Sequence, residues 1–540
     1  MRARLWLLAT LTLIAAAVLA GTIALSASSS IAPREHTVES LFQDDQYLIY
    51  APTATVRRTL ATLASLGVQR VRVTILWSAV APAPRSRVRP PRFDAANPAD
   101  YRAAWAPYDR VLELARARGI GVDFDLTAPG PLWAMQRRSP DPGSANHYVP
   151  SAREFARFVL AVGRRYSGSY VPLHGGRATG APIPRVGFWS LWNEPNQPGW
   201  LAPQWGTVRG ARVIESAALY RRYVDGAVGA LYASGHRGDT ILIGELAPEG
   251  GAVGPRYNWP VAPMQFLRAL YCVDQSYRPL AGGRAKDLGC PAAGGPNAFV
   301  ASHPALFEIT GFSDHPYSFF LAPGTAMPDP DFVPLSELSR LEHGLDGVFA
   351  VYGVRRRLPL YLTEYGYETD PPNPYRGVSP AAQAAYLAQA QYMAWLDPRV
   401  RALSQFLLYD SPPDRAYPRG SFRYWSTFQT GLLYANGARK PAFSSYRLPL
   451  FASDPVFAAG HPITIWGMLR PAPRDGARRA RIEWRGAAGA YRTVATVTAG
   501  ASSGVFEAQI SLPGTGAVRA AWSSPGAIVY SRPVSVQLAR

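Results

Sequence analysis

Two glutamates of this chain follow short apolar runs of the kind that forms buried strands. Glu194 follows residues 186–192 after one intervening Asn, in a turn that contains Pro195, and Glu364 comes after residues 358–363. Active sites of parallel barrels collect where the strands end, so carboxylates in these positions are candidates for chemistry. Glycoside hydrolysis requires a pair of carboxylates that flank the scissile bond. The sequence therefore predicts Glu194 and Glu364 as a catalytic pair.

Two carboxylates can share this reaction only if their surroundings differ. The nucleophile must be ionised, which requires hydrogen-bond donors and positive charge nearby, and Arg72 and the phenol of Tyr317 are the candidate partners. The acid must hold its proton until the bond breaks, and it then serves as the base toward water. We expect the carboxyl groups of Glu194 and Glu364 to lie about 5 to 5.5 Å apart, because a direct nucleophile leaves no room for water between them.

Apolar runs alternate with helical patterns up to Leu450. This alternation predicts a (β/α)8 TIM barrel over residues 40–450, with Glu194 after the fourth strand and Glu364 after the seventh. A doubly wound open sheet would show the same alternation, but it would normally carry a Gly-rich phosphate turn after its first strand, and the sequence shows none. The expected strands are 47–50, 71–76, 121–126, 186–192, 240–245, 309–315, 360–363 and 402–409.

The pattern changes after Leu450, where short alternating segments are separated by Gly, Pro and Ser. Such segments predict a small antiparallel β-sandwich, Ig-like or carbohydrate-binding-like, over residues 451–540. A carbohydrate-binding module and a structural spacer packed on the barrel are the two interpretations of this region. The expected strands are 463–467, 480–484, 493–497, 505–510, 518–522 and 534–538.

The N-terminus has the pattern of an export signal. Two arginines within the first four residues precede an uncharged stretch, residues 5–32, with small-residue cleavage options after Ala20 or Ala27. The stretch is also long enough to span a bilayer, which takes roughly 20 apolar residues, so an uncleaved membrane anchor is the alternative. In both cases we expect the protein outside the cytoplasm, either secreted or anchored to the outer face of the cell membrane.

The chain has only two cysteines, Cys272 and Cys290, which lie close together in the sequence. A close pair in an exported protein predicts a disulfide that ties a loop. Two thiols without clustered histidines make a poor metal site, so we expect no metal.

Composition and charge exclude other classes of protein. At 540 residues and 48% hydrophobic content, the chain can bury a large core and form more than one domain. The formal net charge is +19, but the basic residues are almost all Arg and are scattered along the chain. No nucleic-acid-binding motif accompanies them, so we expect no nucleic-acid partner. We assume a monomer.

The motifs W-N-E-P-N at 192–196 and T-E-Y-G at 363–366 together resemble the retaining glycoside hydrolases of clan A, of the family 5 and family 39 type. The resemblance implies a TIM barrel in which Glu194 is the acid/base and Glu364 the nucleophile. It further implies that Asn193 binds the sugar 2-hydroxyl, that water is the second substrate and that no cofactor is needed. Other pieces that fit the resemblance, and so imply substrate contacts, are Arg72, Trp77, Trp133, His315 and Tyr317.

The sequence departs from the family pattern at the eighth strand. No Trp lies on that strand, and Trp425 arrives only in the following loop. We expect Trp77, Trp133 and Trp425 to offer stacking faces for sugar rings, although core packing is the alternative for each. His315 has no second histidine at ligand spacing, so we expect it to be a hydrogen-bonding residue of the site and not a metal ligand.

Further acids compete for roles near the strand ends. Asp125 and Glu245 are placed to reach sugar hydroxyls, whereas we expect the others to be structural or supporting. These others are Asp123, Asp314, Glu368 and Asp410.

The sequence as a whole predicts an exported retaining glycoside hydrolase that acts on an extracellular oligo- or polysaccharide. One alternative is a non-catalytic glycan-binding or envelope-scaffold protein that keeps the barrel cleft. The other is a transglycosylase, which would use the same residues and differ only in the acceptor that reaches the intermediate.

Overall fold

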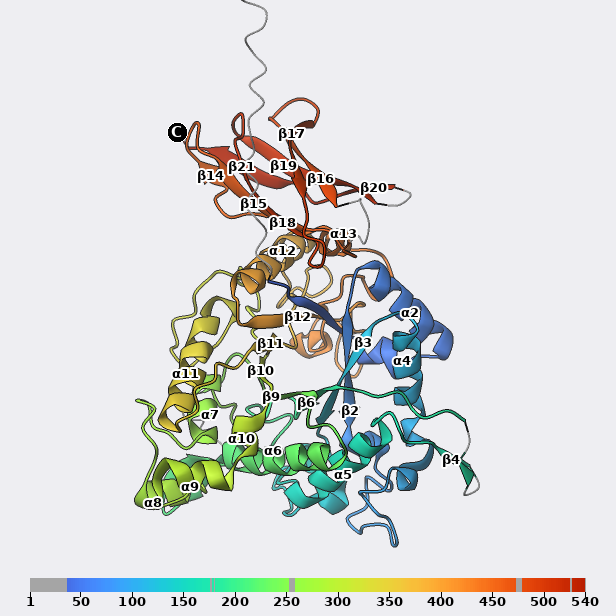
Figure 1. Ribbon diagram of the computed structural model, residues 1–540, viewed down its shortest axis with the longest axis vertical. Coiled ribbons are helices and arrows are strands. Elements are labelled where there is room, and N and C mark those ends of the chain that lie inside the picture. The colour runs from blue at the N-terminus through green and yellow to red at the C-terminus, as the bar shows by residue number, and fades with distance from the viewer. Residues whose placement is uncertain are drawn as a thin grey trace, which may run out of the picture.

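The computed structural model describes residues 36–174, 177–178, 180–251, 258–472, 478–524 and 527–539. The predicted signal peptide or anchor, residues 1–32, lies outside the described residues. The described chain forms a closed parallel barrel surrounded by helices, followed by further sheets near the C-terminus (Figure 1). This confirms the predicted fold class, a TIM barrel followed by a small β domain.

The barrel closes with eight parallel strands in the order β1-β12-β11-β10-β9-β6-β3-β2. Hydrogen-bonded pairing between β1 and β12 closes the ring. Glu194 follows β6, the fourth barrel strand, and Glu364 follows β11, the seventh. The strands are β1 (Glu39–Gln43), β2 (Arg70–Leu76), β3 (Gly121–Thr127), β6 (Phe188–Leu191), β9 (Thr240–Leu246), β10 (Gly311–Asp314), β11 (Leu360–Leu362) and β12 (Val400–Phe406).

The first strand was predicted at 47–50, and this is wrong. The first strand is β1, and the predicted segment overlaps the end of the short helix α1 (Asp45–Leu48). Asp44 begins this helix by accepting a hydrogen bond from the backbone of Tyr47. The true strand was hidden because its Gln43 is polar, and Gln43 faces the polar upper layer of the barrel, where its side chain accepts from Arg72.

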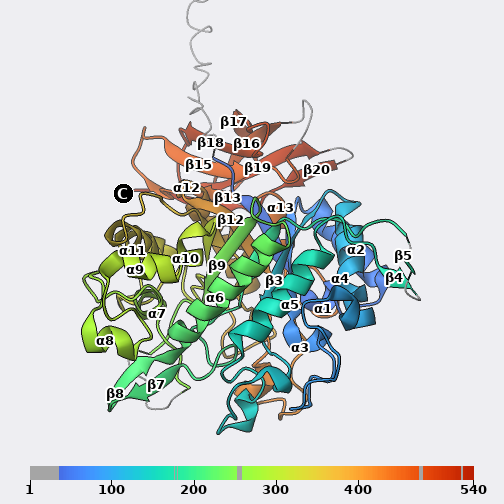
Figure 2. The ribbon, with the colours of Figure 1, turned by 60° about the horizontal axis from the view of Figure 1, so that its bottom comes forward.

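Helices cover the outside of the barrel, and α5 and α6 lie side by side (Figure 2). The longer helices are α2 (Thr53–Ser65), α4 (Ala106–Arg116), α5 (Ala152–Arg165), α6 (Glu215–Ala233), α7 (Pro263–Leu270), α11 (Leu338–Val351) and α12 (Pro380–Leu396). Shorter ones are α3 (Trp77–Val80), α8 (Gly282–Asp287), α9 (Gly295–Ser302), α10 (Ala305–Glu308) and α13 (Pro441–Arg447). The 3-10 segments are η1 (Pro98–Trp105), which is kinked, and the short η2 (Leu132–Ala134), η3 (Pro142–Ser144), η4 (Leu335–Glu337) and η5 (Phe422–Trp425). Two small hairpins pair β4 (Leu173–His174) with β5 (Arg177–Ala178) and β7 (Trp205–Val208) with β8 (Ala211–Ile214).

Two sheets follow the barrel and share one hydrophobic cluster, an arrangement in keeping with the expected sandwich. The six segments expected as strands here are all strands in the structure. The smaller sheet contains β13 (Leu450–Ala452), β15 (Ile463–Met468) and β18 (Val505–Ile510). The larger sheet contains β14 (Val456–Phe457), β21 (Val534–Leu538), β19 (Gly516–Ser524), β16 (Arg479–Arg485), β17 (Arg492–Thr498) and β20 (Ala527–Tyr530).

The C-terminal sheets pack on the barrel at the end where its strands begin. Trp466 of β15 contacts Trp395 of α12, with ring centroids 6.1 Å apart. Arg470 lies against Gly67, in the loop that leads into β2. The carboxyl ends of the strands, where Glu194 and Glu364 lie, are at the opposite end of the barrel. The sheets therefore contact the end of the barrel that lies opposite the site.

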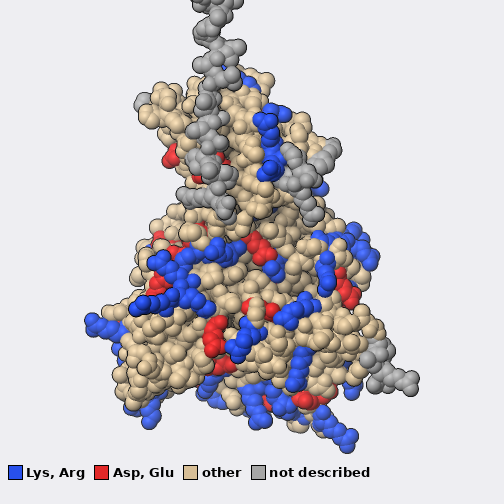
Figure 3. Space-filling view, in the orientation of Figure 1, with Lys and Arg blue, Asp and Glu red and all other residues tan. Residues whose placement is uncertain are grey.

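The structure also shows the state of the cysteine pair, the distribution of surface charge and the character of the helices. Cys272 and Cys290 form a disulfide with their Cα atoms 6.0 Å apart, which confirms the predicted pair. Lys and Arg are dispersed, with Asp and Glu between them, over the face shown in Figure 3. Within the described ranges, no helix is both long and apolar enough to cross a membrane.

Candidate active site

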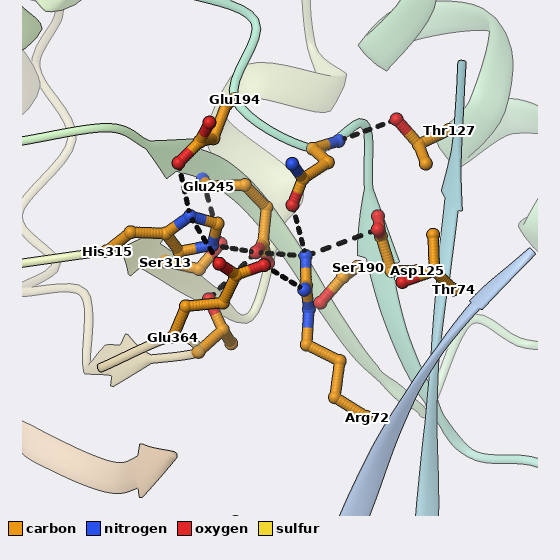
Figure 4. Close-up of polar contacts among 12 residues, drawn as sticks. Arg72, Thr74, Asp125, Thr127, Ser190, Glu194, Glu245, Ser313, His315 and Glu364 are labelled. Carbon is orange, nitrogen blue, oxygen red and sulfur yellow. Dashed lines mark hydrogen bonds and ion pairs between the residues drawn. The ribbon is translucent and has the colours of Figure 1, made fainter. Parts of the chain in front are cut away.

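The two predicted glutamates meet at the mouth of the barrel (Figure 4). One oxygen of Glu194, one of Glu364 and one nitrogen of His315 all lie within 4.8 Å of one another. The side chain of Glu194 is 19% exposed and that of Glu364 is 10% exposed, so both are open to the cleft side of a mostly buried site. The fold thus brings together two carboxylates that are far apart in the sequence.

Arg72 of β2 is the main cation beneath the glutamates. Its Nη1 donates to Glu364 Oε1 at 2.7 Å, and its Nη2 donates to Asn193 Oδ1 at 2.8 Å. Burial works against its charge, but the surrounding carboxylates, Glu245 first among them, outweigh burial and raise the pKa of Arg72 well above its usual value. Arg72 is therefore a permanent positive charge beside Glu364.

Glu364 receives a second hydrogen bond from the other side. The phenol of Tyr317 donates to Glu364 Oε2 at 3.1 Å. Burial and the charge of Glu364 raise the pKa of Tyr317 well above its usual value, so the phenol keeps its proton. Both partners that the sequence suggested for Glu364 are in contact with it, and both stabilise a negative charge there.

His315 links the two glutamates. Its Nδ1 lies 3.0 Å from Glu194 Oε1 and 3.7 Å from Glu364 Oε2, and its Nε2 lies 2.9 Å from Glu245 Oε2. Burial favours the neutral ring, but Glu364, Glu194 and Glu245 outweigh it and raise the pKa of His315 to about 10. At neutral pH the ring is therefore a cation, and each ring nitrogen donates to a carboxylate.

The charge of His315 predicts a specific dependence of stability on pH. The ordinary pKa is 6.5 and the folded value is about 10, so the folded protein holds a proton that the unfolded chain has lost between these values. We expect the stability advantage of the wild type over His315→Gln to be complete below pH 6.5 and to fall above it. The expected slope is roughly 1 kcal/mol per pH unit. Denaturant unfolding at intervals from pH 6 to 10 measures it.

His147→Gln is the matched control for this experiment. His147 is also buried, but burial lowers its pKa, so its contribution does not change above pH 6.5. A stability difference between wild type and His315→Gln that stays constant over this range would show that His315 is neutral in the folded protein.

The spacing of Glu194, His315 and Glu364 would also suit a metal ion, but the surrounding charge opposes one. Nδ1 of the protonated His315 ring donates to Glu194 and has no lone pair for a metal. The guanidinium of Arg72 lies 2.7 Å from Glu364 and repels a second cation. We therefore interpret the three side chains as a set for proton and group transfer.

The turn that carries Glu194 is held in an unusual backbone conformation. Trp192 and Glu194 have φ values of 72° and 39°, a region that costs side-chain-bearing residues free energy and occurs mainly at functional sites. The backbone N–H of Asn193 donates to Thr127 Oγ1 at 2.9 Å. The side-chain NH2 of Asn196 donates to the backbone oxygens of Ala247 and Val261. Its side-chain oxygen accepts from the backbone N–H of Ala247. The second Asn of the W-N-E-P-N motif therefore fastens the turn to the end of β9.

Burial disfavours the charged form of two acids that lie below the glutamates. Burial raises the pKa of Asp123 to about 7 and raises that of Asp125 well above its usual value. Asp123 accepts a hydrogen bond from Ser190 at 3.0 Å, and Asp125 lies 3.2 Å from Arg72. Both are fully buried, so they lie in the barrel interior and not where sugar hydroxyls reach.

Trp77 requires a correction. It was expected to contact substrate, but it is fully buried and its ring stacks on Phe158 with centroids 5.8 Å apart. It lies in the layer between strands and helices, because the chain turns outward into α3 directly after β2.

Trp133 and Trp425 lie in loops at the barrel mouth. Trp133 is in η2 after β3 and donates to the backbone oxygen of Pro82 at 3.0 Å, and Trp425 ends η5 in the loop after β12. Among the described residues, no hydrogen bond or ring contact joins either indole to the two glutamates. Their contact with substrate stays a prediction.

Two phenylalanines lie at the end of the eighth barrel strand and in the loop that follows it. Phe406 ends β12, with its ring 6.5 Å from that of Tyr317 and 5.2 Å from that of Phe428. Phe428 is 50% exposed. The ion pair of Lys440 and Asp410, 2.7 Å apart and buried, holds the loop that carries Phe428. Sequence reasoning missed this aromatic wall, although Phe406 lies within the predicted eighth strand.

The site is thus a pair of carboxylates that face each other at the mouth of a closed (β/α)8 barrel. No protein-family model matches the chain, and no curated protein matches it.

Solved structures similar to the chain carry the names of glycoside hydrolases. A family 39 glycoside hydrolase from Bacteroides cellulosilyticus WH2 is 14% identical with a TM-score of 0.42, over 88% of this chain and 80% of that chain. A glucosidase from Croceicoccus marinus is 14% identical with a TM-score of 0.43, over 89% of this chain and 96% of that chain. A beta-glucosidase from Thermotoga maritima is 14% identical with a TM-score of 0.43, over 76% of this chain and 95% of that chain. At this level of similarity the geometry of the site, and not the likeness, supports the function proposed below.

Proposed function

We propose that this protein is a retaining glycoside hydrolase whose barrel, residues 40–450, carries the catalytic unit. The observation that carries the proposal is the approach of Glu194 and Glu364, with one oxygen of each within 4.8 Å of the other. Inverting enzymes hold their carboxyl groups about 6.5 to 9.5 Å apart so that a water fits between them, whereas retaining enzymes hold them about 5 Å apart.

Glu364 is the proposed nucleophile. It accepts from Arg72 and Tyr317, which stabilise its negative charge and leave its position tightly defined. In the first step a Glu364 oxygen forms a bond to the anomeric carbon while the glycosidic C–O bond breaks. The product of this step is a neutral glycosyl ester.

Glu194 is the proposed acid/base. One of its oxygens is bonded to His315, and in the described part of the chain no donor contacts the other oxygen, Oε2. Charge explains its change of role. The cations Arg72 and His315 balance the anions Glu245 and Glu364, so Glu194 completes a neutral set when it is protonated. As the ester forms, Glu194 gives its proton to the departing glycosidic oxygen, so its new negative charge replaces the charge that Glu364 loses. Glu194 then takes a proton from a water molecule whose oxygen bonds to the anomeric carbon, and the ester bond breaks to free the Glu364 carboxylate.

Other residues of the mouth would bind the sugar. The side-chain oxygen of Asn193 accepts from Arg72, which turns its NH2 group away and leaves it for a substrate hydroxyl. Phe406 and Phe428 form an apolar wall for the C–H face of a pyranose, and Trp425 lies in the same loop as Phe428. Trp133, in the loop after β3, is a further candidate for a sugar contact. The substrate is an extracellular oligo- or polysaccharide. The disulfide of Cys272 and Cys290 supports export, because disulfides persist in oxidising compartments.

The test is the stereochemistry of the first product. A panel of aryl glycosides of both anomeric configurations is screened, and the one that is cleaved is followed by proton NMR before mutarotation. We expect release of the sugar with the configuration of the substrate. Inversion would exclude the covalent intermediate at Glu364.

Two further outcomes of the same screen define the rival functions. Binding of glycans without cleavage of any of them would indicate a glycan-binding scaffold. Transfer to an added sugar acceptor that is faster than hydrolysis would indicate a transglycosylase.

A further inference from the structure

Glu245, on the fifth barrel strand, is the most connected carboxylate of the site, yet in the proposed reaction it neither bonds to substrate nor transfers a proton. One oxygen of its fully buried side chain, Oε2, accepts three hydrogen bonds. The donors are Arg72 Nη2 at 2.9 Å, His315 Nε2 at 2.9 Å and Thr363 Oγ1 at 2.7 Å. Figure 4 shows Glu245 between the arginine and the imidazole.

Each donor belongs to one half of the site. Arg72 binds Glu364 through its other terminal nitrogen, and Thr363 immediately precedes Glu364 in the chain. His315 binds Glu194 through its other ring nitrogen. The backbone carbonyl of Glu245 also accepts the N–H of Glu194 at 3.0 Å. A single residue therefore supports the surroundings of both glutamates.

The backbone at Glu245 is shaped for this position. Gly244 pairs with Ser313 and Leu246 pairs with Asp314, so Glu245 is the extra residue of a β-bulge between β9 and β10. Bulges beside active sites re-aim a side chain. Gly244 has a φ of 109°, and a Cβ there would lie 2.4 Å from the backbone oxygen of Ser313. Glu245 itself has a φ of 48°, a costly conformation that the surrounding contacts must maintain.

The pKa of Glu245 is shifted in the opposite direction from those of the neighbouring buried acids. Burial opposes its ionisation, but Arg72 and His315 outweigh burial and lower the pKa of Glu245 below its usual range. Asp125 and Asp123 face the same space, and burial raises the pKa of both. Of the two cations, Asp125 pairs only with Arg72, and neither of its oxygens accepts a hydrogen bond from a described residue.

We propose that Glu245 is a positioning residue that holds Arg72 against Glu364 and His315 against Glu194. The proposal rests on the proposed function for the roles of the two glutamates, and on the contacts alone for the role of Glu245. Without this carboxylate, two buried cations lose their shared anion, and the guanidinium and the imidazole are free to turn toward the remaining carboxylates.

Glu245→Gln tests the proposal, because Gln keeps the shape and removes the charge. We expect kcat to fall on the order of 100-fold, as reacting groups are displaced. We expect KM to change less than about threefold, because Glu245 does not touch substrate. The second readout is an NMR titration of protein labelled with 13C at histidine Cε1, in which His315 is assigned with His315→Gln. The pKa of His315 is expected to fall in Glu245→Gln.

Asp123→Asn is the matched control. It also neutralises a buried acid of the barrel interior, but Asp123 bonds Ser190 and neither of the two cations. We expect its kcat and its His315 titration to match the wild type. An equal loss of kcat in Asp123→Asn and Glu245→Gln would overturn a specific role for Glu245, as would an unchanged His315 titration in Glu245→Gln.

If Glu245→Gln does not fold, Glu245→Asp decides the question, because Asp keeps the charge but withdraws it by one methylene. A reduced kcat with a shifted His315 signal is expected, and wild-type values for both would refute the proposal. If the wild type cleaves no glycoside, the proposed function fails, while the His315 titrations in wild type and variant still test the positioning role independently.

Discussion

Glu364→Ala is expected to lower the turnover of an activated aryl glycoside on the order of 10⁵-fold or more, because every substrate needs the nucleophile. The vacated space beside Arg72 and Tyr317 can then admit a small anion. Added azide should attack the anomeric carbon directly and return activity, and the product should be a glycosyl azide of inverted configuration. Release of the aryl alcohol measures the rate, and NMR of the azide product measures the configuration.

Glu368→Ala is the control for this loss. Glu368 lies four residues farther along the same loop, and it bonds Asn373 outside the catalytic set. Its removal should leave turnover close to the wild type and should give no response to azide. Wild-type turnover in Glu364→Ala would leave the barrel without a nucleophile at the seventh strand, and the binding-protein interpretation would become the better one.

Glu194→Ala is expected to fail in a different way. An activated leaving group needs little protonation, so the glycosyl ester on Glu364 should still form, but its hydrolysis needs the base and should stall. The expected loss of steady-state turnover is about 10²- to 10⁴-fold. Intact-protein mass spectrometry should show one added glycosyl group. Azide should release this group as a glycosyl azide of retained configuration.

The response to azide distinguishes the two glutamates more sharply than the rates do, because the two variants should yield opposite anomers. Glu249→Ala, which removes an exposed glutamate from the loop after β9, is the control and should accumulate no glycosyl protein. An inverted azide product from Glu194→Ala would reverse the assignment of the two residues.

Much of the barrel could be predicted from the sequence. Seven of the eight barrel strands lie where short apolar runs predicted them, because a strand buried on both faces needs an apolar run whatever its neighbours are. The exception, β1, ends in Gln43, whose polar side chain fits a hydrogen bond from Arg72. A search for apolar runs misses a strand in which a buried polar residue is stabilised by a hydrogen bond from a residue far away in the chain.

The local sequence also does not show which aromatic residues are in the core and which line the site. Nothing near Trp77 in the sequence separates a core indole from a sugar platform. Its burial depends on Phe155 and Phe158 of α5, which the barrel brings beneath it. The eighth-strand wall was likewise hidden, because Phe406 meets Phe428 only after the intervening loop has folded back.

The sequence by itself was enough to select the two glutamates proposed as the catalytic pair, because each follows an apolar strand within a few residues, and a short-range pattern encodes both the strand and its end. Only the tertiary structure decided what surrounds them. Arg72 and Glu245 come from the second and fifth strands and His315 directly follows the sixth, and closure of the ring is what places their charged ends within hydrogen-bonding distance. Contacts between residues so far apart in the chain depend on the packing of the whole barrel, and no local run of residues encodes them.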